Sequence, residues 1–516
     1  MSSRMSRRNF LRFTGSAAGM ALLAACAAPA PAAPAAPAAA DAAAAAAPAA
    51  PTGKMFEGQT LTVAGMSWMW DATKPMYEEF LTETGIKLEV AAFGQQEIED
   101  KLMQAVATDT YLADLIAVLS NDSADVWGSG FCAPVPQEIL DDPEMVWDDV
   151  LPIYRQKVLD YQGQIFGMPF DGDTHHLMFL HTLLDDPDNQ SKFKAQFGYD
   201  LDPDRGPKTW VEHRNYAEFF TGWDWNGDGE PDYGFAHMMK RGDTAFWGFT
   251  SRACAYAKHP EDPGFFFDVE TGTPRINSPA FVRALTEWKE ELQWGPPGMA
   301  SMGWGEVIQA SQALKVAMNI GWDGTVMATE ASQGKGQASF SVLPGSNDVY
   351  NAKSGEWETH DEINFAPYLA AGGWQISVAA KSEAPDAAWA LSKHFTNKEW
   401  GNRFCFEGYR NPIRVSEVTD IKPWVEGKLQ FGERSATTYV RALNETMSHP
   451  NLVLDLRVPG WTQYRDAVEL AVSRALADEA SPEQALNDCA DAWTQITDRL
   501  GGAEKQMEQY SDFLGL

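Results

Sequence analysis

Short β-rich runs alternate with amphipathic helical segments along most of this 516-residue chain. Residues 59–66 alternate apolar and polar side chains, residues 74–84 repeat apolar side chains at helical spacing, and residues 86–91 are again β-rich. Gly85 stands at the predicted helix end, where a glycine commonly closes a helix. Residues 114–119 form a continuous apolar run typical of a buried parallel strand. The pattern predicts β-α-β units and a doubly wound sheet.

The same alternation continues after residue 160. We expect strands over 163–170, 176–180, 316–320 and 373–379, and helices over 209–221, 278–292, 304–314, 384–396, 398–406 and within 462–500. No repeat of 20 to 50 residues recurs, which disfavours a solenoid or a propeller. The fold class is therefore α/β with at least two lobes.

The formal net charge is −32, from 72 Asp and Glu against 40 Lys and Arg. This acidity excludes long-range attraction to nucleic acid or to anionic lipid. The chain also has 19 Trp, and the indole ring is a large flat face suited to cores and to flat ligands. We therefore expect a small-molecule partner and no nucleic acid.

The first 25 residues predict an export signal. Arg7 and Arg8 precede an apolar stretch that is too short for a permanent membrane span, as in a twin-arginine signal. The stretch ends in Leu-Ala-Ala-Cys at Cys26, which looks like a bacterial lipobox, although an ordinary secretory signal remains an alternative. We expect a lipid on Cys26, an exported chain on the outer face of the cell membrane, and membrane contact through this anchor only.

Residues 27–52 contain 18 Ala and 6 Pro, a composition that cannot form a core. Residues 26–53 are therefore predicted to be a tether. Four further cysteines, at positions 132, 254, 405 and 489, lack any metal-ligand spacing, and the sequence does not show whether or how they pair.

Several sequence segments, taken in their order along the chain, resemble the family 1 extracellular solute-binding proteins. These are the sugar-binding lipoproteins of ABC importers and are related to maltose-binding protein. They include FLTETGIKLEV at 80–90, DLIAVLSNDSADVWGSGFCAPV at 114–135, GQIFGMPF at 163–170 and LKVAMNIGWDG at 314–324. The resemblance spans nearly the whole chain after the tether. It implies a non-enzymatic, monomeric receptor that closes on a sugar and delivers it to the transmembrane subunits of an ABC permease.

The resemblance also implies two α/β lobes that are joined by hinge strands and have a ligand cleft between them. We expect hinges near 166–173, 372–377 and Arg434. The first lobe would comprise 54–170 plus 376–434, and the second lobe 171–375 plus 435–516.

A sugar-binding cleft needs aromatic faces for the C–H groups of the ring and planar polar groups for its hydroxyls. Ligands of doubly wound sheets lie beyond the carboxyl ends of strands, where we find Trp or polar side chains close together. The candidate ligand-binding residues are Trp68, Trp70, Asp71, Asn121, Asp122, Asp171, Asp173, Trp322, Asp323, Trp374, Arg410 and Trp461. Core packing for each Trp, and helix capping for Asn121 and Asp122, are the alternatives.

A separate acidic loop resembles a calcium-binding EF-hand loop. Its oxygen donors are Asp224, Asn226, Asp228, Glu230 and Asp232, but position 12 is Phe235 instead of the bidentate Glu. One structural calcium ion and a simple Asx-rich turn without any cofactor both fit this loop.

Two other functions remain open. A secreted glycoside hydrolase would need two carboxylates about 5 to 10 Å apart, which a sequence cannot place. A receptor for a peptide or a polyamine would suit the acidity. The mixture of Trp, Asp and Arg favours a neutral sugar.

Overall fold

The protein is described by a computed structural model, which covers residues 53–516. The predicted signal, Cys26 and the tether up to residue 52 lie outside the described residues. Within residues 53–516 no helix combines the length and the apolar composition that crossing a bilayer requires.

The first lobe is built on a five-stranded sheet of order β2-β1-β3-β14-β6. Strands β2, β1 and β3 are parallel, whereas β14 runs antiparallel to both of its neighbours, β3 and β6. The strands are β1 (Thr60–Met66), β2 (Lys87–Phe93), β3 (Leu115–Leu119), β6 (Met168–Pro169) and β14 (Trp374–Val378). Every residue of β3 and β14 is buried, as expected for the centre of a sheet covered on both faces.

Helices α2 (Lys74–Thr84), α3 (Gln95–Thr108), α13 (Pro385–Thr396) and α14 (Lys398–Phe406) belong to this lobe. Helix α2 has Pro75 in its first turn and ends at Gly85, whose φ of 82° places it in the left-handed region. Shorter elements fill the connections: α1 (Ser67–Trp70), α4 (Ser123–Val126), α5 (Gln137–Leu140), β4 (Asp160–Tyr161), β5 (Gln164–Ile165) and α15 (Lys422–Glu426).

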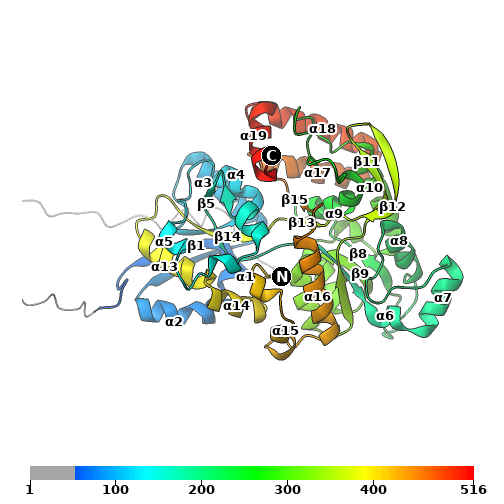
Figure 1. The fold of residues 1–516 in the computed structure, drawn as a ribbon, viewed down its shortest axis with the longest axis horizontal. Helices are drawn as coiled ribbons and strands as arrows, with labels where there is room; N and C mark the ends of the chain where they lie inside the picture. The colour runs from blue at the N-terminus through cyan, green and yellow to red at the C-terminus, as the bar shows by residue number, and fades with distance from the viewer. Residues whose placement is uncertain (1–52) are drawn as a thin grey trace, which may run out of the picture. The chain divides into compact units, whose positions relative to one another are not determined.

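The second lobe is built on a four-stranded sheet of order β10-β7-β9-β8. Its strands are β7 (His176–Leu180), β8 (Tyr233–Ala236), β9 (Val316–Gly321) and β10 (Ala338–Ser341). Its helices are α6 (His181–Asp185), α7 (Pro187–Phe197), α8 (Trp210–Phe219), α9 (Ala245–Ala257), α10 (Pro279–Glu290), α11 (Trp304–Gln312), α12 (Asp323–Glu330) and α16 (Glu433–Met447). Figure 1 shows the two sheets side by side, each with its own helices.

The second lobe carries two additions. A hairpin of β11 (Ser346–Asn351) and β12 (Glu356–Asn364) lies against α9. The C-terminal helices α17 (Trp461–Leu476) and α18 (Pro482–Arg499) pack against the α9–α10 pair, and α19 (Ala503–Leu514) packs on α18 (Figure 1). A short parallel pair, β13 (Tyr368–Leu369) with β15 (Val453–Leu454), lies near the passage between the lobes.

The chain passes between the two sheets at three places. These are the segment from β6 to β7, the segment from β13 to β14, and the segment before α16, which packs on β10. The passages lie close to the expected hinges, but Trp374 and Gln375 pair with the first sheet and not with the second lobe. The exact lobe boundaries at 171, 376 and 435 stay a prediction.

The run at 163–170 is not the single strand that its composition predicts. Gly163 has φ of 78° and turns the chain between β4 and β5, and β6 forms only after Gly167. A Cβ at Gly167 would approach the Cβ of Gln375 on β14 to 2.7 Å, so a glycine is needed where β6 meets that strand. By contrast, α2, α14 and β7 begin and end at the predicted residues.

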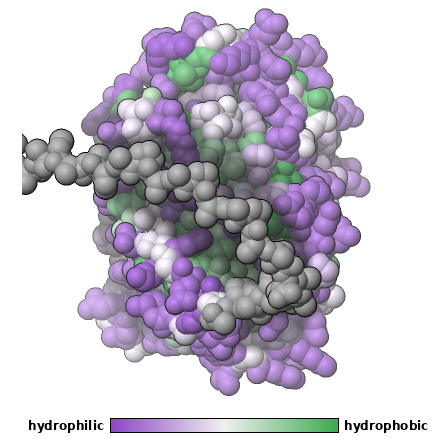
Figure 2. Space-filling view, turned by 90° about the vertical axis from the view of Figure 1, so that its left-hand side faces the viewer, coloured by the Kyte–Doolittle hydropathy of each residue, from purple (hydrophilic) through white to green (hydrophobic). Residues whose placement is uncertain are grey.

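Charged side chains cover much of the molecule. On the face shown in Figure 2 hydrophilic residues predominate, and hydrophobic residues gather in smaller patches near the middle of the face.

Candidate functional site

A cavity of about 560 Å³ lies where the two lobes face each other. The first lobe contributes residues at the ends of β1 and β3 and at the start of β14, and the second lobe contributes α11, α12 and the segment before α9. Its lining includes Met66, Trp68, Gln95, Leu119, Asp171, Asp173, Asp243, Thr244, Trp304, Ile308, Trp322, Met327, Trp374, Tyr409, Arg410, Asn411 and Leu429. This volume suits a small molecule, and the wall is mostly apolar with a few polar groups.

Four tryptophans line the cavity, and their neighbours fix two of the indole rings. The Trp322 Nε1–H donates to the carbonyl of Ala370 at 3.1 Å, and the Trp304 Nε1–H donates to Thr325 Oγ1 at 3.3 Å. The rings of Trp304 and Trp322 meet edge to face, with centroids 6.4 Å apart. Rings held in this way offer faces to a ligand without further loss of conformational freedom.

Two buried carboxylates, Asp171 and Asp173, follow β6 where the chain passes between the lobes. Asn411 holds both of them: its backbone N–H donates to Asp171 Oδ1 at 2.6 Å, and its side-chain amide donates to Asp173 Oδ1 at 2.7 Å. Both side chains also line the cavity, so each carboxylate can present an oxygen to a ligand group.

Burial dominates the electrostatics of this pair. It raises the pKa of Asp171 to about 7, against the opposing effect of the Asn411 N–H and Arg410. Burial and the charges of Asp171 and Asp323 raise the pKa of Asp173 well above its ordinary value. These shifts favour the protonated carboxyl groups, which can donate as well as accept hydrogen bonds.

Among the described residues, Arg410 is the only arginine or lysine that lines the cavity, and its charge is already balanced. It pairs with buried Glu417, to which its Nη1 donates at 3.1 Å, and the same nitrogen donates to the carbonyl of Asn411 at 2.7 Å. Arg410 therefore positions the segment that carries Asn411.

The structure brings six of the twelve predicted ligand-binding residues together at the cavity: Trp68, Asp171, Asp173, Trp322, Trp374 and Arg410. Asp323 lies buried behind the wall, 3.0 Å from His176 Nε2. Whether any of these residues contacts a ligand stays a prediction.

The other five predicted residues do not line the cavity. Trp70 is turned into the first-lobe core against Phe395, because residues two apart on a helical turn point in different directions. Asp71 is exposed just after α1.

Asn121 and Asp122 face the second lobe instead of the cavity. The side-chain amide of Asn121 donates to the carbonyl of Leu456 at 2.8 Å. Both carboxylate oxygens of Asp122 are buried without a hydrogen-bond partner, and burial raises its pKa well above the ordinary value. Trp461 is fully buried at the start of α17 and packs on Trp247. Asn121, Asp122 and Trp461 therefore contribute to packing within a lobe or between the lobes.

Six polar or aromatic lining residues were not predicted. Tyr409 and Asn411 flank Arg410 in one short segment, so that segment could have suggested them. Gln95, Asp243, Thr244 and Trp304 lie at the beginnings of helices or just before them, and nothing in the local sequence marks them as facing a cleft.

The acidic loop at 224–232 carries its own cation, Lys315. The Lys315 ammonium contacts Asp228 and lies 3.1 Å from Asp232 Oδ1. Asp224 accepts backbone N–H groups from Gly227, Asp228 and Gly229, and Asp232 Oδ2 accepts those of Trp225 and Asn226. This is the hydrogen bonding of an Asx-rich turn. The four cysteines of the described residues are buried free thiols: Cys132, Cys254, Cys405 and Cys489.

Two α/β lobes with a cavity between them, connected by three passages of the chain, define the class of two-lobed solute receptors. A family model described as bacterial extracellular solute-binding protein matches residues 75–425. The chain belongs to this family.

Known relatives agree with this class. A probable amino-acid ABC transporter periplasmic-binding protein of Sinorhizobium fredii is 25% identical over 382 residues, covering 71% of this chain and 75% of the relative. A solute-binding protein of Agrobacterium radiobacter, solved with ribitol, has a TM-score of 0.67 at 19% identity and covers 86% of this chain and 100% of its own.

A maltose-bound protein of Thermotoga maritima has a TM-score of 0.64 at 18% identity, covering 85% of this chain and 100% of its own. At these identities the two solved structures establish the fold.

Proposed function

We propose that this protein captures a carbohydrate, either a mono- or oligosaccharide or a related polyol, and delivers it to the permease of an ABC importer. The cavity with four tryptophans and two buried carboxylates carries this proposal. Indole faces suit the C–H side of a sugar ring, and Asp171, Asp173, Gln95 and Asn411 suit its hydroxyls. The ribitol and maltose complexes of similar proteins support the same class of ligand.

The proposal includes how the receptor reaches its partner. Lipid on Cys26 and the 26-residue Ala/Pro segment that follows would hold a monomeric receptor on the outer face of the cell membrane, close to the permease. A ligand that touches both lobes favours the closed form by its differential affinity for that form.

A thermal-shift screen of sugars and polyols tests the ligand class. A ligand present at about 100 times its dissociation constant should stabilise the protein by about 2.7 kcal/mol. Mass spectrometry of the recovered sugar should show it unchanged, whereas a hydrolysed product would support the glycosidase alternative.

Trp68→Ala and Trp304→Ala test the site with one ring from each lobe. Each should weaken binding of the identified sugar roughly tenfold, as loss of an aromatic contact does. Trp223→Ala is the matched control, since Trp223 is exposed and lies outside the cavity. If both cavity variants bind like the wild type, the sugar is held elsewhere.

A cationic solute, such as a polyamine or a basic peptide, is the second candidate. Three acidic side chains line the cavity, Asp171, Asp173 and Asp243, while Arg410 is neutralised by Glu417. A bound cation would favour release of the protons that burial keeps on Asp171 and Asp173 in the empty cavity. Protonated amines also bind indole faces. Isothermal titration with spermidine and with glucose separates the two candidates.

A further inference from the structure

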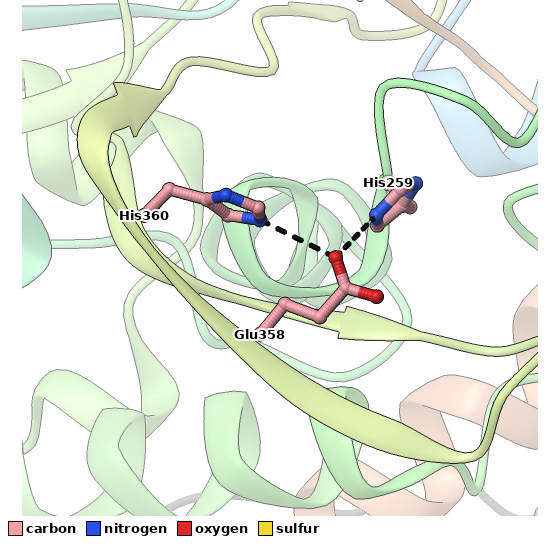
Figure 3. Close-up of side chains that lie close together, drawn as sticks. All are labelled: His259, Glu358 and His360. Atoms are coloured by element: carbon pink, nitrogen blue, oxygen red, sulfur yellow. Dashed lines mark hydrogen bonds and ion pairs between the residues drawn. The ribbon is translucent and has the colours of Figure 1, made fainter.

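The β11–β12 hairpin and the segment after α9 bring two histidines and a glutamate together, outside the cavity. His360 Nε2 and His259 Nε2 lie 3.4 Å and 3.2 Å from the same oxygen of Glu358, Oε2. Figure 3 shows both rings directed at this carboxylate. The three ligand atoms all lie within 4.8 Å of one another.

The strand geometry makes this arrangement possible. Glu358 and His360 are two residues apart on β12, so their side chains leave the same face of the strand. His259 comes from a segment about 100 residues earlier, just beyond the end of α9, and is buried, whereas Glu358 is half-buried and His360 exposed. The cluster is thus anchored on one side and open to solvent on the other.

We propose that His259, Glu358 and His360 bind one divalent transition-metal ion of the Zn²⁺ type. Two imidazoles and a carboxylate, with water in the remaining position, form a common zinc ligand set. Bonds of roughly 2.0–2.1 Å at tetrahedral angles place ligand atoms about 3.3 Å apart, close to the N–O separations of 3.2 Å and 3.4 Å at Glu358 Oε2. Ca²⁺ and Mg²⁺ prefer oxygen ligands and fit this cluster poorly.

The surroundings of Glu358 favour its role as a ligand. The Asn351 side-chain amide donates to Glu358 Oε1 at 2.7 Å, which orients the carboxylate and leaves Oε2 toward the histidines.

One contact opposes binding. The N–H of Glu261 donates to His259 Nδ1 at 3.2 Å, and a metal on Nε2 would move the ring proton to Nδ1. The Glu261 contact must therefore be given up, which lowers the affinity without removing a ligand.

The proposed metal would clamp the hairpin to the end of α9. The opposite end of α9 follows Asp243 and Thr244 at the cavity, about 20 Å away along the 13-residue helix. The metal should therefore stabilise the second lobe without changing the affinity for the transported solute.

Zinc titration of the chelator-treated full chain, in competition with a chromophoric chelator, tests the proposal. We expect one Zn²⁺ per chain and a higher melting temperature with zinc, and no displacement by excess Ca²⁺. Glu358→Gln, which removes the charge but keeps one oxygen that can accept from Asn351, and the double variant His259→Ala/His360→Ala should each weaken binding at least tenfold. Circular dichroism verifies that both variants fold.

Glu356→Gln is the matched control, because Glu356 is exposed on the same strand but lies outside the cluster. It should bind zinc like the wild type. The proposal is overturned if the wild type binds no zinc, or if the cluster variants, folded, bind it with unchanged stoichiometry and affinity. Unchanged sugar binding in these variants keeps this test separate from that of the proposed function.

Discussion

At the scale of single residues, the protonation of Asp171 links the cavity to stability. Burial raises its pKa to about 7, whereas an Asp in an unfolded chain has a pKa of about 3.9. Between these values the folded state keeps a proton that the unfolded state releases. The free energy of unfolding therefore falls as the pH rises through this window, and the penalty is fully present above pH 7.

Asp171→Asn removes this titration while retaining an oxygen that accepts from the Asn411 N–H. As the pH rises from 5 to 8, the wild type should lose on the order of 1–3 kcal/mol of unfolding free energy that the variant keeps. Urea unfolding at both pH values measures the difference. Exposed Asp71→Asn is the control, and parallel pH profiles for the wild type and Asp171→Asn would contradict the prediction.

Gly373 is a second residue whose identity the passage between the lobes requires. Its φ is 88°, and an added Cβ would lie 2.0 Å from the carbonyl oxygen of Asp171. Gly373→Ala should lower the free energy of unfolding by at least about 2 kcal/mol, because the backbone itself must move. Gly94→Ala has open space and negative φ, so its effect should be small. Equal urea midpoints for the two variants would refute this reading.

At the scale of elements, a buried ion pair joins α3 of the first lobe to α17 of the second. Glu99 and Arg465 are 2% and 3% exposed, so water screens neither charge. Glu99→Gln removes the buried carboxylate that pairs with Arg465 and leaves the guanidinium only the longer contact to exposed Asp466, at 3.6 Å. The loss should cost about 3 kcal/mol in unfolding free energy. Glu97→Gln, on the exposed side of the same helix, should change it by less than about 1 kcal/mol. Chemical unfolding of both variants checks this, and similar losses would disprove it.

The calcium prediction for the 224–232 loop also belongs to this scale. Lys315 competes with any cation for Asp228 and Asp232. If calcium binds, Lys315→Met should bind it at least about tenfold more tightly than the wild type, since one competing charge is removed. Calorimetric titration of chelator-treated protein measures both affinities. Absence of heat in both proteins would end the calcium hypothesis.

At the scale of the whole molecule, solute binding should bring the two lobes together. Small-angle X-ray scattering should show a smaller radius of gyration once the identified sugar is added. A double variant, Trp68→Ala/Trp304→Ala, should show no change at the same sugar concentration. An unchanged radius in the wild type with saturating sugar would exclude closure.

The local sequence determined the elements and the general plan. Hydrophobic periodicity and the end signal Gly85 were sufficient to predict α2, and the apolar run at 114–119 was sufficient to predict β3. Both signals depend on neighbours in the chain. The order of such elements, together with the segments that resemble solute-binding proteins, was sufficient to identify the family. The β11–β12 hairpin and α9 were not predicted. Helix α9 is buried on nearly every side, so its sequence lacks the apolar stripe of an amphipathic helix.

Only the tertiary structure decided which side chains share the cavity. Trp68 and Trp70 are equivalent in the sequence, yet helix geometry turns one toward the cavity and the other into the core. Asp243 and Trp304 reach the cavity from separate parts of the second lobe, and His259 meets Glu358 across about 100 residues. Periodicity reports which face of an element is buried, whereas contacts between distant segments arise from how whole elements pack.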